Sequence, residues 1–294
     1  MFKINKHHIN FKLLLLILIS SCIILLFLFI IYILYFYEPT TIIKSKYELE
    51  KDGIKLYTKI FTIDEIKEMK EMCEKEKYQT LKKYLSNHSK IKEIIGELKP
   101  IQEYELHDYI FIIKKSNIHT CHRDNNGSIY NKNQKHPSYT LIIYLENMDK
   151  CLGVIPQSHK LIDKYNWNIT KNPIENIQCS EGDIIIFDAN TIHTGTIENK
   201  KDNNVRIQMK ISHPDDINIL SFYQKYNKML NEENVLNKNV KKFQQNISCM
   251  FPVLSDMTQN EHKNKARGDT NTTLSYLMSG NNKFYNFIDV TTSQ

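Results

Sequence analysis

The chain begins with a long apolar run. Residues 13–37 comprise 25 residues without a charge, and roughly 20 apolar residues suffice to cross the hydrocarbon core of a bilayer. Tyr32, Tyr35 and Tyr37 cluster at one end of the run, where an aromatic belt would lie. The alternatives are a buried core helix and a cleaved signal peptide, whose apolar region is only about 7–15 residues and ends in small residues. The length and the bulky end favour an uncleaved transmembrane anchor.

A linker at residues 38–54 leads into an amphipathic region. Thr62 and Glu65 have the spacing of a capping box, and Ile63, Ile66 and Met69 follow at helical intervals. The pattern predicts one helix over residues 62–84 and a second over residues 89–98. We interpret their apolar stripe as core contact.

Beyond about residue 103 the pattern changes to short runs rich in Ile, Tyr, Val and Phe. Four of them, separated by turn-like segments, cover 103–115, 138–147, 182–193 and 204–212. Helices followed by strands predict an α+β fold that is dominated by a β sandwich or jelly roll.

Helical signals return after residue 214. Apolar side chains recur over residues 217–236, and residues 244–294 are polar. The expected organisation is a basic flank (1–12), an anchor (13–37), a linker (38–54), a jelly-roll domain (55–213) and a helical, polar extension without an assigned role (214–294).

The charge balance bears on partners and on topology. The net charge is +6, and it falls to +3 when residues 1–37 are set aside, because Lys3, Lys6 and Lys12 are the only charges there. Such a balance gives no basic face for nucleic acid. The basic flank favours a cytoplasmic N-terminus and a lumenal or exterior body.

The cysteines and the glycosylation sequons leave the compartment open. Of the six cysteines, Cys22 lies in the apolar run, and the other five are too few for a dense disulfide framework. Five N-x-S/T sequons occur, at Asn87, Asn126, Asn168, Asn246 and Asn271, and several are expected by chance in a chain this rich in Asn.

A metal-binding pattern follows the first predicted strand. His122 and Asp124 are two residues apart, so their side chains leave the same face of an extended chain. Together they supply two of the three ligands of a facial triad for non-haem Fe(II). His193 follows the buried-strand pattern of residues 182–187, and Arg206 comes 13 residues later, at the start of the next strand.

These residues carry a family resemblance over about residues 55–213. The sequence resembles the Fe(II)/2-oxoglutarate dioxygenase superfamily, and within it the phytanoyl-CoA dioxygenase branch. The matching elements are His122-x-Asp124, Tyr144-Leu-Glu, Gly153-Val-Ile-Pro-Gln-Ser158-His159, Gly182-Asp183, His193 and Arg206. This sequence departs from the family's usual Pro-Gly-Ser-His at one position, because Gln157 stands in place of Gly.

The resemblance implies a double-stranded β-helix and a catalytic metal. His122, Asp124 and His193 would ligate Fe(II), and Arg206 would bind the distal carboxylate of the cosubstrate 2-oxoglutarate, to which Thr140 could add a hydroxyl donor. Ascorbate is a candidate reductant. A membrane-anchored hydroxylase acting on a lipid or a protein side chain is the function expected from it.

Other interpretations stay open. Arg206 could be a surface ion-pair residue, and Ser158-His159 could face substrate or form only a turn. Tyr144 is read as core, Asp183 as a turn residue, and His213, in the second His-x-Asp of the chain, as a polar residue closing the last strand. The alternative functions are a metal-binding, cupin-like module and a catalytically inactive, membrane-anchored surface glycoprotein, which a glycan on Asn126 would favour.

Overall fold

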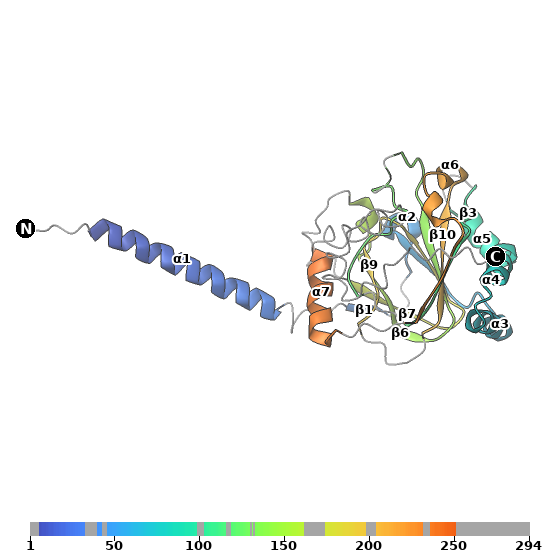
Figure 1. Cartoon of the computed structure of the whole chain (residues 1–294), viewed down its shortest axis with the longest axis horizontal. Helices are drawn as coiled ribbons and strands as arrows, with labels where there is room; N and C mark the ends of the chain where they lie inside the picture. The colour runs from blue at the N-terminus through green and yellow to red at the C-terminus, as the bar shows by residue number, and fades with distance from the viewer. Residues whose placement is uncertain are drawn as a thin grey trace, which may run out of the picture.

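The computed structural model describes residues 6–32, 40–42, 46–98, 103–115, 119–129, 131, 133–161, 174–197, 204–231 and 236–250. Within them, two β-sheets face each other (Figure 1). The larger sheet has the order β11 (Tyr226–Asn231), β4 (Tyr109–Lys115), β10 (Arg206–Ser212), β5 (Tyr139–Tyr144), β8 (Ile184–Asp188) and β2 (Ile54–Tyr57), and β3 (Glu105–Leu106) also pairs with β10. The smaller sheet has the order β1 (Thr40–Ile42), β7 (Glu175–Cys179), β6 (Met148–Val154) and β9 (His193–Thr194). The predicted α+β jelly roll is confirmed.

Three helices cover the outer face of the larger sheet. They are α3 (Ile63–Glu74), α4 (Tyr78–Asn87) and α5 (Ser89–Gly96), and their apolar stripes pack on β4, β5, β8 and β10. The Thr62–Glu65 capping box is present. The single helix expected over 62–84 is wrong, because the chain breaks at Glu76, where φ is +51°, and restarts as α4.

The larger sheet is buried on both faces, which explains its continuous apolar runs. Ile142, Tyr144, Ile185 and Phe187 point inward and pack against β6 and β7 of the smaller sheet. β10 differs from its neighbours because its sequence alternates strictly. Its apolar residues lie under the helices, so its alternate residues, including Arg206 and Lys210, face the interior of the barrel.

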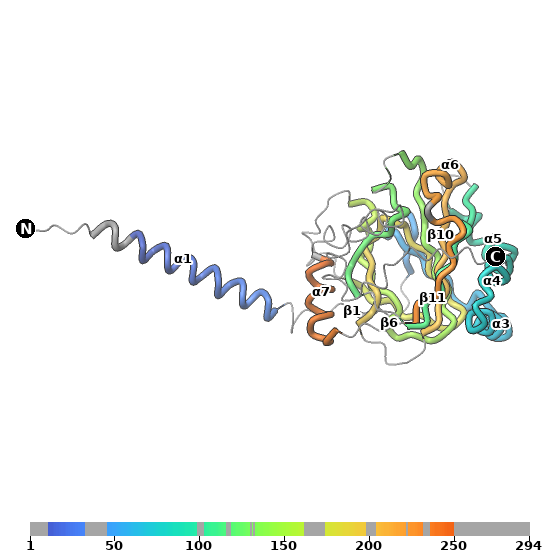
Figure 2. Tube along the Cα trace, viewed as in Figure 1, coloured from blue at the N-terminus to red at the C-terminus, as the bar shows by residue number. Residues whose placement is uncertain are grey.

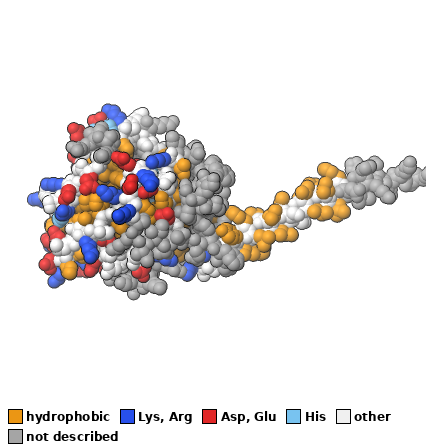
Figure 3. Space-filling view, turned by 180° about the vertical axis from the view of Figure 1, so that it is seen from behind, with side chains coloured by type: hydrophobic (Ala, Val, Ile, Leu, Met, Phe, Trp, Pro, Cys, Tyr) orange, Lys and Arg blue, Asp and Glu red, His pale blue; other side chains and the backbone are white. Residues whose placement is uncertain are grey.

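The N-terminal helix α1 (Lys6–Ile31) stands apart from this body. Its segment Phe11–Ile31 is 21 residues long, has a mean hydropathy of 3.3 and is not buried against the rest of the structure. Figure 3 shows it as an apolar rod, whereas charged side chains of both signs are scattered over the body. It is long and apolar enough to cross a membrane, although a signal sequence would have the same properties. Tyr35 and Tyr37 of the expected aromatic belt lie outside the described residues.

The body extends past both expected domain boundaries. The short helix α2 (Leu49–Asp52) and strand β1 fall within the expected linker. The helix expected over 217–236 is wrong. The chain instead forms the short helix α6 (Pro214–Ile217), a 3-10 turn and β11, which joins the larger sheet parallel to β4, where Tyr226 stacks on Tyr109. Helix α7 (Lys238–Met250) lies on the opposite side of the sheets from α3–α5 (Figure 2).

Candidate metal centre and cosubstrate pocket

The two predicted histidine ligands lie directly opposite each other. The His122 N–H donates to the His193 carbonyl at 2.9 Å, and the His193 N–H donates to the His122 carbonyl at 3.0 Å. This isolated bridge joins the loop after β4 to the start of β9, and His193 also pairs with Val154 of β6. Backbone hydrogen bonds therefore fix the spacing of the two imidazoles, whose ring centroids are 4.4 Å apart.

The same local device orients both rings. His122 Nδ1 lies 2.9 Å from the Thr120 carbonyl, and His193 Nδ1 lies 2.9 Å from the Thr191 carbonyl. A carbonyl can only accept, so Nδ1 carries the proton and the lone pair of Nε2 is available to a metal. Burial, together with the neighbouring His122, lowers the pKa of His193 to about 3. The imidazole of His193 is therefore neutral at physiological pH, as a metal ligand must be.

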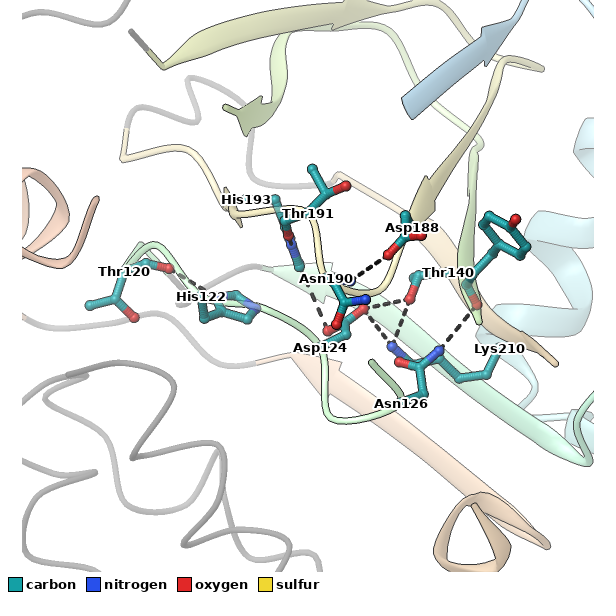
Figure 4. Close-up of polar contacts among 11 residues, drawn as sticks. Thr120, His122, Asp124, Asn126, Thr140, Asp188, Asn190, Thr191, His193 and Lys210 are labelled. Carbon is teal, nitrogen blue, oxygen red and sulfur yellow. Dashed lines mark hydrogen bonds and ion pairs between the residues drawn. The ribbon is translucent and has the colours of Figure 1, made fainter. Parts of the chain in front are cut away.

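Asp124 completes the cluster (Figure 4). Its Oδ1 lies 3.8 Å from His193 Nε2, and its Oδ2 accepts hydrogen bonds from Thr140 Oγ1 at 2.5 Å and from Lys210 Nζ at 2.6 Å. The three ligand atoms lie within 4.8 Å of one another, so small rotations would bring all of them to about 2.0–2.2 Å from one cation. The predicted convergence of His122, Asp124 and His193 is observed.

Lys210 is a site residue that the sequence analysis missed. Its side chain is 2% exposed, and its ammonium donates to both Asp124 and Thr140. Burial by itself raises the pKa of the Asp124 carboxyl, but the Lys210 ammonium beside it outweighs burial and holds this pKa well below its usual range. The signal was present in the sequence, because the alternation Arg-Ile-Gln-Met-Lys-Ile-Ser puts Lys210 on the same face as Arg206.

Arg206 lies deeper in the barrel, opposite Tyr144 on β5. Its side chain is buried, and its one hydrogen bond within the described residues runs from Nη1 to the Asn204 carbonyl at 3.3 Å. No described carboxylate pairs with the guanidinium, and burial lowers the pKa of Arg206. The interpretation of Arg206 as a surface ion-pair residue is therefore wrong. Tyr144 is a fully buried core residue, as expected, and its hydroxyl has no hydrogen-bond partner in the described part of the chain.

Thr140 lies at the other end of the same strand. It pairs with Lys210, four residues along β10 from Arg206, which is about 13 Å of strand. The structure engages its hydroxyl with Asp124 and Lys210. A direct bond from Thr140 to the distal carboxylate of a cosubstrate stays a prediction.

Ser158 and His159 support the site from behind. The Ser158 hydroxyl is fully buried and accepts from the Ile192 N–H at 2.8 Å, one residue before the candidate ligand His193. The ring of His159 packs against Gly53. Gln157, which replaces the family's glycine, adopts φ = +66°, a left-handed conformation that favours glycine. Ser158 and His159 lie in a 3-10 turn, in line with one of the two alternatives, and a substrate-facing role for them stays a prediction.

Helix α7 of the C-terminal extension clamps both ligand segments. Gln244 bonds His119, Ser248 accepts from the Cys121 N–H, and Gln245 donates to Thr194. A disulfide joins Cys121, which precedes His122, to Cys249 of α7. This part of the extension thus has a structural role that its sequence pattern alone does not indicate.

Three other residues also receive definite positions. Asp183 accepts from the backbone N–H groups of Ser180 and Lys59, so it serves the turn as expected. His213 follows β10 and caps α6 by accepting from the Asp215 N–H. Asn126 is fully buried and donates to the Tyr139 carbonyl, so the folded domain has no room for a glycan at that sequon.

The chain was compared with protein families, curated proteins and solved structures. Residues 61–201 match the family described as phytanoyl-CoA dioxygenase (PhyH), whereas none of the curated proteins matches the chain. Among solved structures, iron-bound HygX from Streptomyces hygroscopicus is 11% identical, with 56% of this chain and 84% of that chain covered and a TM-score of 0.45.

Two further structures are similar at the same level. The non-heme, alpha-ketoglutarate-dependent epimerase SnoN from nogalamycin biosynthesis is 13% identical (56% and 80% covered, TM-score 0.46). AviO1 from Streptomyces viridochromogenes is 15% identical (56% and 92% covered, TM-score 0.42). These likenesses are too low to transfer a reaction or a substrate. The family match over residues 61–201, together with the His-Asp-His cluster, supports the resemblance to the phytanoyl-CoA dioxygenase branch of the Fe(II)/2-oxoglutarate dioxygenase superfamily.

Proposed function

We propose that this protein is a membrane-anchored, Fe(II)- and 2-oxoglutarate-dependent dioxygenase that hydroxylates a lipid or a protein side chain. The observation that carries the proposal is the buried Arg206 guanidinium, which has no carboxylate partner among the described residues. A buried charge without a counter-charge is costly. A dicarboxylate cosubstrate that reaches in from the metal would supply that counter-charge.

The residues fit the metal and the cosubstrate. Nε2 of His122, Nε2 of His193 and Oδ1 of Asp124 would hold Fe(II), leaving the remaining positions open. Iron with 2-oxoglutarate and O2 supplies the oxidising power for attack on a C–H bond, and ascorbate is a candidate reductant for maintaining the metal. The guanidinium fork of Arg206 would pair bidentately with the distal carboxylate, and the Tyr144 hydroxyl offers a further donor beside it.

The surroundings keep the reaction dry. Apolar side chains of the two sheets, including Phe187 and Ile185, line the interior between the metal cluster and Arg206, so water has few polar partners there. Thr140 and Lys210 hold Oδ2 of Asp124, which leaves Oδ1 as the single ligand oxygen.

Two observations support a body that faces the lumen or the exterior. The apolar helix α1 is preceded by a basic flank, and the Cys121–Cys249 disulfide is typical of an oxidising compartment. Protease added to the cytoplasmic side of sealed vesicles should leave the body intact. Digestion from that side would contradict this orientation.

Binding measurements on the purified full-length chain test the activity. Arg206→Ala removes a charge-assisted contact worth about 1.5–3 kcal/mol, so 2-oxoglutarate affinity should fall roughly tenfold to a hundredfold, while Fe(II) affinity is unchanged. Arg206→Lys should restore only part of the loss, because an ammonium is not a fork. His122→Ala and Asp124→Ala should abolish metal binding and succinate release together.

The competing functions give different results. A metal-binding cupin-like module would bind Fe(II) and show no change in 2-oxoglutarate affinity when Arg206 is replaced. An inactive surface glycoprotein would release no succinate from 2-oxoglutarate. The buried position of Asn126 counts against a glycan at the metal centre.

A further inference from the structure

Two buried cysteines meet inside the barrel. The Sγ atoms of Cys151 and Cys179 lie 2.8 Å apart, which is closer than the usual contact between non-bonded sulfur atoms. The residues belong to the paired antiparallel strands β6 and β7, and the register shifts between Met148 and Leu152. This irregularity brings Cys151 beside Cys179, and both side chains join the inward-facing cluster of the two sheets.

We propose that Cys151 and Cys179 form a second disulfide bond. The Cys121–Cys249 disulfide lies in the same domain, and a compartment that oxidises one close pair of thiols also oxidises another. Cys73 lies in the separate core beneath α3–α5, so the local geometry pairs Cys151 with Cys179 and leaves Cys73 as a thiol.

The bond would form by thiol–disulfide exchange during folding, before the sulfurs are buried. The oxidant is the disulfide of a protein dithiol–disulfide oxidoreductase. A thiolate of one cysteine attacks that disulfide, and the second cysteine then attacks the mixed disulfide. The two thiols lose two electrons and two protons, and the oxidoreductase leaves as a dithiol.

The location gives the bond a role in the site. Cys151 and Cys179 pack in one cluster with Tyr144, which is paired with Arg206. A disulfide here would fix the wall that faces the Arg206 pocket, and it would fix β6, which pairs with His193 of β9. A disulfide sulfur carries no proton or charge. The oxidised cysteines therefore cannot form a thiolate that would compete with 2-oxoglutarate for the Arg206 guanidinium. This role rests on the proposed function, whereas the existence of the bond does not.

Peptide mapping decides whether the bond exists. The full-length chain is purified from its membrane, its thiols are blocked with N-ethylmaleimide during denaturation, and it is digested with trypsin without reduction. Lysines between the two cysteines, such as Lys160 and Lys171, separate them into different peptides. We expect Cys151 and Cys179 in one linked species, with Cys73 alkylated.

The Cys121–Cys249 pair is the internal control. If that pair is linked while Cys151 and Cys179 are both alkylated, the proposal is wrong. It is also wrong if neither pair is linked, or if Cys151 is joined to Cys73. None of these outcomes depends on iron or 2-oxoglutarate, so the proposed function can fail while the disulfide stands.

Variants then test what the bond does. The double variant Cys151→Ser/Cys179→Ser removes both thiols without leaving a reactive one, and we expect its Tm to fall by about 5–10 °C relative to the oxidised parent. The 2-oxoglutarate Kd should rise severalfold, with Fe(II) affinity less affected. The matched control Cys73→Ser should leave the linked peptide in place. An unchanged 2-oxoglutarate Kd in the double variant would contradict the proposed effect of the disulfide on the Arg206 pocket, even if peptide mapping finds the bond.

Discussion

Lys210 and Asp124 form a buried ion pair at the candidate metal centre, with Nζ 2.6 Å from Oδ2. The ammonium therefore balances the charge of the ligand carboxylate and at the same time directs it. Oδ1, the oxygen nearest His193 Nε2, is left for a cation. One lysine thus has two opposite effects on metal binding, because it orients the ligand and repels the ion.

We expect repulsion to be the larger effect. Removing one partner of a buried pair costs about 3–5 kcal/mol, so Lys210→Met should destabilise the metal-free protein by that order. A divalent cation would then supply the missing charge, and the rise in Tm on adding Mn(II) should be larger in the variant than in the parent. A smaller rise would mean that orientation of Asp124 by Lys210 dominates.

We expect Asp188 to make the stability of the protein depend on pH. Burial raises the pKa of this carboxyl to about 6, whereas an unfolded Asp titrates near 3.9. The folded state therefore holds the proton more tightly, and stability falls as pH rises from about 4 to about 6. Asp188→Asn should be up to about 3 kcal/mol more stable than the parent at pH 7 and equal to it near pH 3.5. Urea unfolding at both values measures this, and a constant difference would exclude Asp188 as the cause.

Gln157 predicts a stabilising substitution. A left-handed conformation costs a non-glycine residue about 1–2 kcal/mol. Replacing Gln157 by glycine removes this cost, but the greater entropy of glycine in the unfolded chain offsets part of the stabilisation. Gln157→Gly should therefore raise the free energy of unfolding by about 0.5–1 kcal/mol. Lys160→Gly, in the adjoining 3-10 turn, is the matched control and should not stabilise. A loss of stability in Gln157→Gly would show that the Gln side chain makes a compensating contact.

Because the Cys121–Cys249 disulfide ties α7 to the segment of His122, we expect its loss to affect both stability and metal affinity. The disulfide closes a loop of 128 residues. Because such a cross-link lowers the conformational entropy of the unfolded chain, it should stabilise the folded state by roughly 4–5 kcal/mol. Cys121→Ser/Cys249→Ser should lose stability of this order. It should also weaken Fe(II) binding, because α7 no longer holds the segment of His122. Calorimetry with Mn(II) would show whether metal affinity falls with stability or is independent of it.

Helices and strands whose hydrophobic pattern has one clear period could be predicted from the sequence. The strands that precede His122 and His193, and the strand that starts at Arg206, were found because their runs are apolar or alternating and are bounded by turns. The break at Glu76 was not found, since helical periodicity continues on both sides of it. Strand β11 was taken for a helix because Tyr226 and Leu230 are four residues apart, and only the contact with Tyr109 on β4 decides the matter.

The convergence of His122, Asp124 and His193 could be predicted from the sequence, but the charged residues that balance Asp124 could not. A His-x-Asp pair has a fixed spacing, whereas the partner of Asp124 comes from Lys210, 86 residues away. The polar face of β10 could have indicated a charged interior. The contacts of α7 with the segments of His122 and His193 could not be inferred, because they join residues 51 to 128 positions apart.

Strand β1 limits where the domain can work. It starts at Thr40 and pairs with β7, only eight residues after Tyr32, which follows the apolar helix. Eight extended residues reach at most about 28 Å. If α1 spans a bilayer, the barrel is held close to the membrane surface and explores a thin layer along it. Substrates would then be encountered by lateral diffusion in that layer, so their density per membrane area, rather than their bulk concentration, would set the turnover.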